Sequence, residues 1–432
     1  MLYRYSNASL FLLMFIFICG CQSTDEKSIE ATKNLMINYA VGYDTLGIPD
    51  LDLSYQRNLK AMAFPDTLNR QEIFFQQYQK DLAKIDPTYL PEDLLQDYEI
   101  LDLEISLQLE RINLELNHQS TYKNRPISEE GIYFVPNGKA WYRYYLKRWL
   151  MADVEPEEII DFGTKKIQAV QRDIQKLQRD LGFRTDTIAF YEHLNEPLFK
   201  ERSKRKIQRL FETRQEIVRK NLDVCFKNTD ITPPNIDRGS DPKFTELPAY
   251  YNSEKETFYY NLNKAPFNKR QVDLLYLHEA IPGRHYLMKI KELFKDSVPA
   301  FYQHLPQGIY SAGWAAYVDD LGEEMGLYRT LYDLMGKHEW NLVRSVCVVL
   351  DIGLNYQGWS DEKALAFWKT NINNHEDIAL REINQMRRWP VQVITFKYGA
   401  ARILDKRRAK NLKGGFNLKD FHQEILSKGG IF

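Results

Sequence analysis

Cysteine is scarce in this chain, with four residues among 432. Two of them, Cys19 and Cys21, lie close to the amino terminus and leave Cys225 and Cys347 for the rest of the protein. Both of the latter are flanked by apolar residues in helix-like patterns. We therefore expect two buried free thiols rather than a disulfide or a thiolate metal site.

The chain also lacks an excess of charge of either sign. Its 58 lysine and arginine residues nearly cancel its 59 aspartate and glutamate residues, so we predict no nucleic-acid partner. Low-complexity segments and internal repeats are missing, which excludes linker, collagen-like and solenoid architectures. No nucleophile elbow, P-loop or dinucleotide fingerprint occurs, which removes serine hydrolases and nucleotide enzymes.

Long apolar runs are limited to the amino terminus, where residues 10–18 form an apolar block too short to span a bilayer as a mature helix. The sequence Ile-Cys-Gly-Cys that ends at Cys21 resembles a bacterial lipobox. We predict a lipoprotein signal peptide over residues 1–20, lipidation at Cys21 and a polar tether over residues 21–28. The alternative is an ordinary signal peptide or an uncleaved anchor. The predicted location is the bacterial cell envelope, anchored to the membrane by lipid and facing the periplasm or the surface.

The remaining residues indicate a mainly α body. Apolar residues in segments 155–181 and 197–226 recur at helical spacing, which predicts two long helices. Segment 101–116 is ambiguous, because its leucine and isoleucine residues alternate as in a strand but also line one helix face. We predict a helix there, since the intervening residues are not β-branched. Aromatic pairs on both sides of a polar turn predict a small β hairpin within residues 246–262.

The strongest chemical signal is the pair His278 and Glu279. In an H-E-x-x-H helix two histidines bind zinc and the glutamate polarises the bound water, but here Pro282 occupies the fourth position. His285 follows seven residues after His278, about 10.5 Å away along a straight helix, which is too far for one ion. Pro282 must break the helix, and Gly283 provides the necessary backbone freedom. A kink could bring the two histidines together to bind one metal ion, whereas an ordinary Pro-Gly helix end would not. The sequence pattern is compatible with either arrangement.

The segment H-E-A-I-P-G-R-H at residues 278–285 resembles the H-E-x-x-P-G-H-H signature of a bacterial family, the domain of unknown function 885. Three later blocks resemble further family motifs in the same order, at residues 313–317, 344–359 and 381–399. The resemblance extends over about residues 249–407. Members of this family are similar to gluzincin metallopeptidases: they are largely helical, often exported, and many are lipoproteins.

The resemblance implies a large helical, gluzincin-like body at residues 29–432, with a small β hairpin or sheet beside a central cleft. Residues 29–226 would form an N-terminal helical half, and residues 241–432 would form the half that carries the motif. By analogy, zinc would be held by His278 and His285, and Glu279 would act as the general base on the bound water. The third zinc ligand is not identified. The candidate contacts to a peptide-like substrate are Arg284, Tyr317, Lys397 and Tyr398.

The chain departs from the family pattern at five positions, which makes the active-site motif degenerate. The substitutions are Arg284 for the first of the paired histidines, Ala312 for the glutamate that would be the third ligand, Asn355 for a histidine, Val391 for a glycine and Phe396 for a tyrosine. Four of the five remove a group that could bind metal, move a proton or stabilise an oxyanion. Asp319 lies about 10 Å further along the helix from Ala312 and is too far to replace the missing ligand directly.

Two functions therefore compete. The first is an exported zinc-dependent peptidase that hydrolyses peptides with metal-activated water, with His278, Glu279 and His285 intact. The second is a non-catalytic envelope lipoprotein that binds peptide or glycan in the cleft without metal. The oligomeric state is left open.

Overall fold

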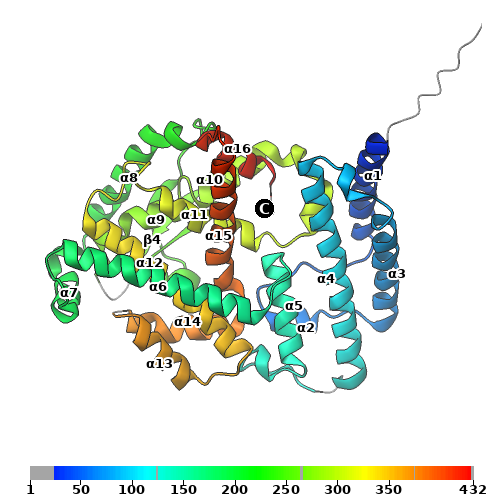
Figure 1. Cartoon of the computed structure of the whole chain (residues 1–432). Coiled ribbons are helices and arrows are strands. Elements are labelled where there is room, and N and C mark those ends of the chain that lie inside the picture. The colour runs from blue at the N-terminus through cyan, green and yellow to red at the C-terminus, as the bar shows by residue number, and fades with distance from the viewer. Residues whose placement is uncertain (1–23, 123–124, 263–265, 374, 430–432) are drawn as a thin grey trace, which may run out of the picture.

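The computed structural model describes residues 24–122, 125–262, 266–373 and 375–429, and these are mainly helical, as predicted (Figure 1). The α-helices are α1 Thr24–Asp44, α2 Tyr55–Lys60, α3 Pro65–Leu82, α4 Glu92–Tyr122, α5 Gly138–Leu150, α6 Pro156–Asp180, α7 Thr187–Leu194, α8 Lys204–Cys225, α9 Val272–Glu279, α10 Arg284–Phe294, α11 Gly308–Val318, α12 Leu331–Asn355, α13 Asp361–Asn371, α14 Glu376–Arg388, α15 Gln392–Leu412 and α16 Leu418–Ser427. The strands are β1 Lys200–Glu201, β2 Asn235–Arg238, β3 Ala249–Asn252, β4 Thr257–Tyr260 and β5 Phe267–Asn268. Short 3₁₀ turns are η1 Pro87–Tyr89, η2 Ile132–Phe134, η3 Pro197–Phe199, η4 Pro242–Phe244, η5 Lys269–Gln271, η6 Lys295–Ser297, η7 Ala300–His304 and η8 Asp319–Leu321.

Two of the predicted helices form where the apolar spacing places them. α6 spans residues 156–180, and it begins with Pro156 in its first turn and a capping box between Glu155 and Glu158. The ambiguous segment 101–116 lies inside the long helix α4, so the helix prediction is confirmed there. The two remaining cysteines, Cys225 and Cys347, are buried and free, as expected.

The predicted helix over residues 197–226 is wrong at its amino-terminal end. Residues 197–199 form a 3₁₀ turn, and β1 pairs antiparallel with β5 before α8 begins. The Ser203 hydroxyl accepts a hydrogen bond from the Lys206 amide and caps α8. The pairing of β1 with a strand about 65 residues later is a long-range contact, which helical periodicity in the sequence does not reveal.

The predicted hairpin is confirmed as β3 and β4, which pair antiparallel. The sequence analysis missed β2, which pairs parallel to β4, so the sheet has the order β2-β4-β3 and β3 is an edge strand. Three of the four residues in β2 are exposed, so β2 carries little of the hydrophobic alternation that marks a half-buried strand.

The helices are arranged in two groups. α1 to α5 lie together on one side of the molecule, and the sheet and α7 to α12 lie on the other (Figure 1). α6 runs along α12, and α11 packs closely against α15. A Cβ atom on Gly313 would lie 2.7 Å from the Cα of Gly399, so the α11–α15 contact needs a glycine at this crossing. α6 therefore joins the second group through its packing on α12, although it follows α1 to α5 directly in the chain.

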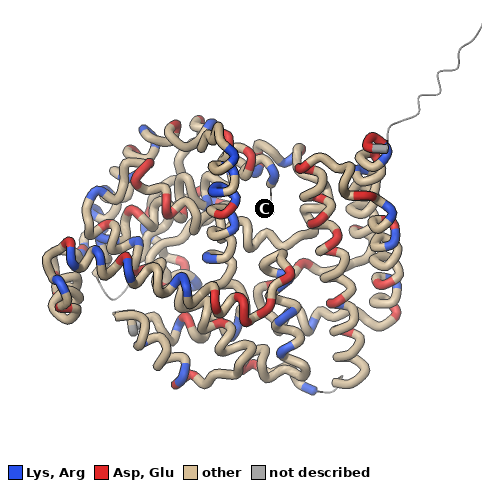
Figure 2. The backbone as a smooth tube through the Cα atoms, viewed as in Figure 1, with Lys and Arg blue, Asp and Glu red and all other residues tan. Residues whose placement is uncertain are grey.

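The predicted signal peptide, and Cys21 with it, lies outside the described residues. α1 begins at Thr24, within the predicted tether over residues 21–28, and Asp25 and Glu26 in its first turn favour a helix there. No helix in the described part of the chain is long and apolar enough to cross a membrane. Basic and acidic residues are interspersed over the described helices without a large region of one sign (Figure 2).

Candidate functional site

The helix that carries His278 ends directly after it. α9 stops at Glu279 and α10 starts at Arg284, so the break predicted at Pro282 is confirmed. Gly283 lies in the break, where a Cβ atom would be 2.0 Å from the carbonyl oxygen of His278. Glycine is therefore required by the close approach of the two backbone segments.

Asp319 holds the imidazole of His278 in one orientation. Both carboxylate oxygens of Asp319 lie 3.2 Å from Nδ1 of His278, and Arg344 donates to the same carboxylate at 2.5 Å. Burial alone would raise the pKa of Asp319, but its hydrogen bonds and electrostatic interactions with His278 and Arg344 outweigh burial and lower the pKa. An ionised carboxylate can only accept, so Nδ1 of His278 donates its hydrogen bond to Asp319, and Nε2 has no hydrogen-bonding partner among the described residues.

Both ring nitrogens of His285 form hydrogen bonds within the protein. Nε2 lies 2.8 Å from the carbonyl oxygen of Thr232, and Nδ1 lies 2.8 Å from the hydroxyl of Tyr251. A carbonyl only accepts, so Nε2 carries the proton and Nδ1 accepts from the hydroxyl. Burial lowers the pKa of His285 and favours this neutral form. No nitrogen lone pair of His285 remains for a metal ion.

The side chains of the predicted zinc site therefore do not fit the metal. A zinc ion needs three or four converging nitrogen, sulfur or oxygen donors. The described residues contain no group of three or more His, Cys, Asp or Glu side chains that could hold a metal ion. The break between α9 and α10 does not give His278 and His285 a shared partner: His278 contacts Asp319, and His285 contacts Tyr251 and Thr232.

Glu279 is also engaged. Its carboxylate accepts a hydrogen bond from the amide of Tyr251 in the edge strand β3, at 3.1 Å. The same oxygen lies 3.3 Å from Nε of Arg284, so the two side chains form an ion pair. The Glu279 carboxylate is therefore bound to a strand and to a cation.

His278, Glu279 and Arg284 share a cavity of about 420 Å³. Its other walls come from β3, η4, α12, α14 and α15. Five basic and three acidic residues line it: Lys243, Arg284, Arg344, Arg381 and Arg388, with Glu246, Glu279 and Glu382. The ring of Phe396 stacks at 5.9 Å from His278, and the guanidinium groups of Arg284 and Arg344 lie 5.7 and 5.6 Å from its centroid. The cavity combines cations with aromatic and aliphatic walls.

Three of the predicted substrate contacts do not line this cavity. Tyr317 is fully buried, and its hydroxyl contacts His422 at 2.7 Å. Lys397 donates to the side chain of Asn341 at 3.3 Å, and burial lowers the pKa of Lys397 to about 8. Tyr398 packs edge-on against Phe162. Of the predicted substrate contacts, Arg284 is the one that faces His278 and Glu279.

Two contributors to the site were missed by the sequence analysis. The sequence analysis treats Asp319 only as a replacement for the ligand missing at Ala312, whereas in the structure its carboxylate lies 3.2 Å from Nδ1 of His278. Tyr251 was assigned to the hairpin alone, yet it contacts both Glu279 and His285. The buried Asp319 and the half-buried Tyr251 are weak signals in a sequence, because neither has a fixed sequence spacing from its partner.

The substituted position Val391 has a structural consequence. Val391 adopts φ 73°, a left-handed conformation that suits glycine, which is the residue of the resembling family motif. Its amide donates to the carboxylate of Asp351, which also accepts from the hydroxyl of Tyr142 at 2.6 Å. Asn355, where the resembling motif has a histidine, donates to the carbonyl of Met386. These groups support the backbone between α14 and α15.

Comparisons with known proteins give a family and two solved structures. A family model described as a bacterial protein of unknown function (DUF885) matches residues 114–431. A candidate lipoprotein from Colwellia psychrerythraea is 20% identical, with a TM-score of 0.64 over 87% of this chain and 67% of that chain. A candidate lipoprotein of unknown function from Shewanella oneidensis is 17% identical, with a TM-score of 0.57 over 96% of this chain and 78% of that chain. These similarities concern the fold. No curated protein matches the chain.

Proposed function

The chain belongs to the DUF885 family of bacterial proteins, and we propose that it is a lipid-anchored envelope protein that binds peptides by their carboxyl terminus without zinc chemistry. The anchor follows from the lipobox-like sequence at Cys21, and the candidate lipoproteins of similar fold agree with it. The location is the cell envelope, on the periplasmic or surface face. The peptide would lie in the cavity beside α9.

The observation that carries this proposal is the state of Arg284. Its side chain is 34% exposed to solvent, and its terminal nitrogens make no hydrogen bond to a described residue. Among the described residues, its ion pair is with Glu279 and involves Nε, at a distance of 3.3 Å. The planar end of the guanidinium can therefore take a ligand carboxylate through two parallel hydrogen bonds.

The other cations of the cavity are paired more tightly. Arg344 contacts Asp319 at 2.5 Å, and Arg381 contacts Glu382 at 2.6 Å. Lys243 and Arg388 are exposed at the cavity and add positive charge there. The balance of five basic against three acidic lining residues favours an anionic group on the ligand.

The apolar walls favour a peptide over a free small anion. Leu274, Leu275, Val343 and Phe396 line the cavity next to the charged groups, with Trp389 beside them. A hydrophobic residue at the carboxyl end of a peptide would bury its side chain against this wall while its carboxylate reaches Arg284. The edge strand β3 borders the same cavity through Ala249.

Calorimetric titration of the purified protein with trileucine and with trileucine amide tests the proposal. We expect the free acid to bind at least about tenfold more tightly than the amide, because one charge-assisted pair is worth about 1.5–3 kcal/mol. Arg284→Gln should remove this preference, whereas Arg408→Gln, an exposed arginine away from the cavity, should keep it. Equal binding of acid and amide, or binding that Arg284→Gln leaves unchanged, contradicts the proposal.

The same samples test the competing hypothesis that the protein is a zinc-dependent peptidase. Chromatography of the peptide after prolonged incubation should show it intact. Hydrolysis that Glu279→Gln abolishes would support the peptidase instead, because that variant keeps the size of the side chain but removes the base.

A further inference from the structure

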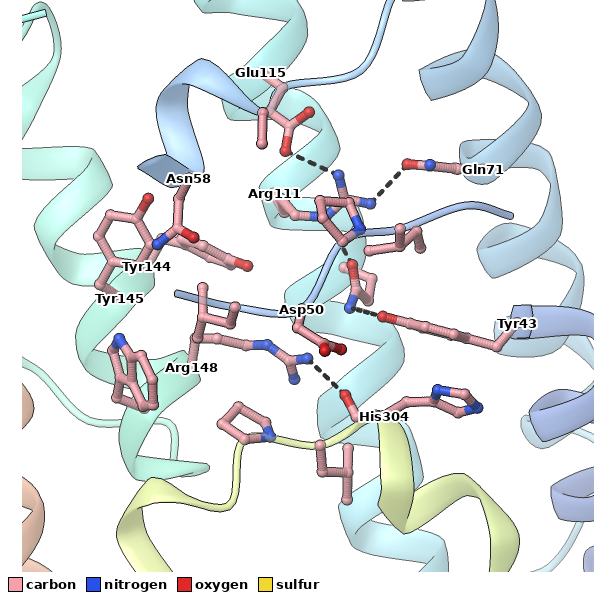
Figure 3. Close-up of a pocket in the computed structure, with 18 of the residues that line it drawn as sticks. Tyr43, Asp50, Asn58, Gln71, Arg111, Glu115, Tyr144, Tyr145, Arg148 and His304 are labelled. Atoms are coloured by element: carbon pink, nitrogen blue, oxygen red, sulfur yellow. Dashed lines mark hydrogen bonds and ion pairs between the residues drawn. The ribbon is translucent and has the colours of Figure 1, made fainter. Parts of the chain in front are cut away.

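A second cavity lies in the group of helices on the other side of the molecule, between α1, α4, α5 and the segment before α11 (Figure 3). Its volume is about 640 Å³, and small-molecule sites commonly have about 300–1,000 Å³. It shares no lining residue with the cavity beside α9. It is therefore a separate site from the one proposed above to bind peptides.

One face of α5 supplies the aromatic wall. Trp141, Tyr144, Tyr145 and Trp149 recur at helical spacing and line the cavity together with Arg148. The ring of Trp149 also covers Gly308, where a Cβ atom would lie 2.9 Å from it. Five bulky residues on one face make a rigid surface with both apolar rings and polar edges.

One face of α4 supplies the polar wall, and its central residue is Arg111. The guanidinium donates to the side chains of Gln108, Glu115 and Gln71 at 2.7, 2.9 and 2.8 Å, as Figure 3 shows for Glu115 and Gln71. Gln108 in turn donates to the hydroxyl of Tyr43 at 3.1 Å. The planar polar groups are therefore held in fixed orientations before any ligand binds.

The buried charges of this cavity are balanced. Arg111 pairs with Glu115, and Arg148 pairs with the fully buried Glu104. Arg148 also donates to the carbonyl of His304 at 3.3 Å. Neither arginine has an unpaired charge to offer, and the exposed Asp44 and Asp50 at the lining would repel an anion. The cavity therefore disfavours an anionic ligand.

Polar groups nevertheless remain open to a ligand. Oε2 of Glu115 is buried and has no hydrogen-bond donor in the described structure. Glu115 itself is only 7% exposed, and its side chain faces the cavity beside Arg111 (Figure 3). The hydroxyl of Tyr144 also makes no hydrogen bond to a described residue. Oε2 of Glu115 can therefore accept a hydrogen bond from a ligand, and the hydroxyl of Tyr144 can donate or accept one.

We propose that this cavity binds a neutral sugar. A pyranose ring has one face of C–H groups, which packs on aromatic rings, and a rim of hydroxyls, each of which donates and accepts hydrogen bonds. Its apolar face would lie against Trp149, and a hydroxyl would donate to Glu115. A free amino acid or the carboxyl end of a peptide fits less well, because its carboxylate would need a cation that the paired arginines do not provide.

The test is calorimetric titration of the purified protein with maltotriose, cellotriose, N,N′-diacetylchitobiose and digalacturonic acid. We expect at least one of the three neutral sugars to bind and the anionic sugar to bind at least tenfold more weakly. Trp149→Leu should weaken that binding at least tenfold, and Trp149→Phe should restore part of it. Glu115→Gln, which is nearly isosteric, should weaken it several-fold even if Trp149→Leu does not fold.

The matched control is Trp340→Leu, which alters the other cavity and should leave sugar affinity unchanged. The proposal is overturned if none of the three neutral sugars binds, if digalacturonic acid binds as tightly, or if Glu115→Gln and Trp149→Phe both leave the affinity unchanged. Because Arg284 lies in the other cavity, failure here leaves peptide binding untouched, and the reverse also holds.

Discussion

The Nδ1 atom of His278 lies 3.2 Å from both carboxylate oxygens of Asp319, and this contact decides what the histidine can do. The carboxylate fixes the tautomer with the proton on Nδ1, so Nε2 keeps its lone pair toward the cavity. A metal-binding histidine is often oriented in the same way by a carboxylate. In the described residues no further side chains converge with His278 to form a metal site, which leaves Nε2 available as a hydrogen-bond acceptor.

The first prediction concerns the stability that Asp319 provides. Asp319→Asn should lower the free energy of unfolding by about 3 kcal/mol, because it leaves the guanidinium of Arg344 without its buried counter-ion. Urea unfolding followed by circular dichroism measures the loss. The neighbouring Asp320, whose side chain is 40% exposed and pairs with Lys337, is the matched control. Asp320→Asn should cost less than about 1 kcal/mol. Equal losses in both variants would refute the role given to Asp319.

The second prediction concerns pH. Burial raises the pKa of Asp351 to about 7, although the hydroxyl of Tyr142 and the amide of Val391 act in the opposite direction. In the unfolded chain this carboxyl has a pKa near ~3.9, so between about pH 4 and 7 the folded state binds more protons. Its contribution to stability is therefore complete below about pH 4 and is lost as the pH rises through about 7.

Asp351→Asn should remove this dependence, because the amide does not titrate. Urea unfolding at several pH values between about 5 and 8 should show the wild-type protein losing on the order of a few kcal/mol relative to the variant. Asp405→Asn, at an exposed position, should keep the slope of the wild-type protein. A slope that Asp351→Asn leaves unchanged would show that another group titrates.

The third prediction concerns the left-handed backbone at Val391. A β-branched residue at φ 73° is strained by about 1–2 kcal/mol, and glycine would release that strain. Val391→Gly still removes a buried side chain, so we expect a net loss of about 1 kcal/mol. Val346→Gly, at an equally buried position in α12, should lose about 3 kcal/mol or more. Thermal unfolding of both variants measures the difference, and similar losses would exclude strain at Val391.

The fourth prediction concerns zinc. Protein purified without chelator and equilibrated with zinc should contain far less than stoichiometric metal by atomic emission, because His285 has no free lone pair. His278→Ala and His285→Ala should not change this trace amount. Stoichiometric zinc that both variants lose would show that Tyr251 releases His285 when the metal binds, and it would reopen the peptidase function.

Patterns within single segments allowed much of the fold to be predicted. The spacing of apolar residues gave α6 and the central part of α4, and Pro282 with Gly283 gave the break between α9 and α10. Helical period and the missing amide of proline act over a few residues, so they are readable without the tertiary structure. The strand β2 was missed because its partner, β4, lies some 20 residues away and few of its own residues are buried.

The sequence by itself determined the helical class, the helix break and the identities of His278, Glu279 and His285. Only the tertiary structure decided their chemistry: Asp319, 41 residues from His278, fixes one imidazole, and Tyr251, 34 residues from His285, occupies the other. Such partners come from elements that meet only after packing, at rotations that no local pattern sets. The same reason applies to the second cavity, where α4 and α5 each show a regular face but the balance of their charges depends on how the two helices pack.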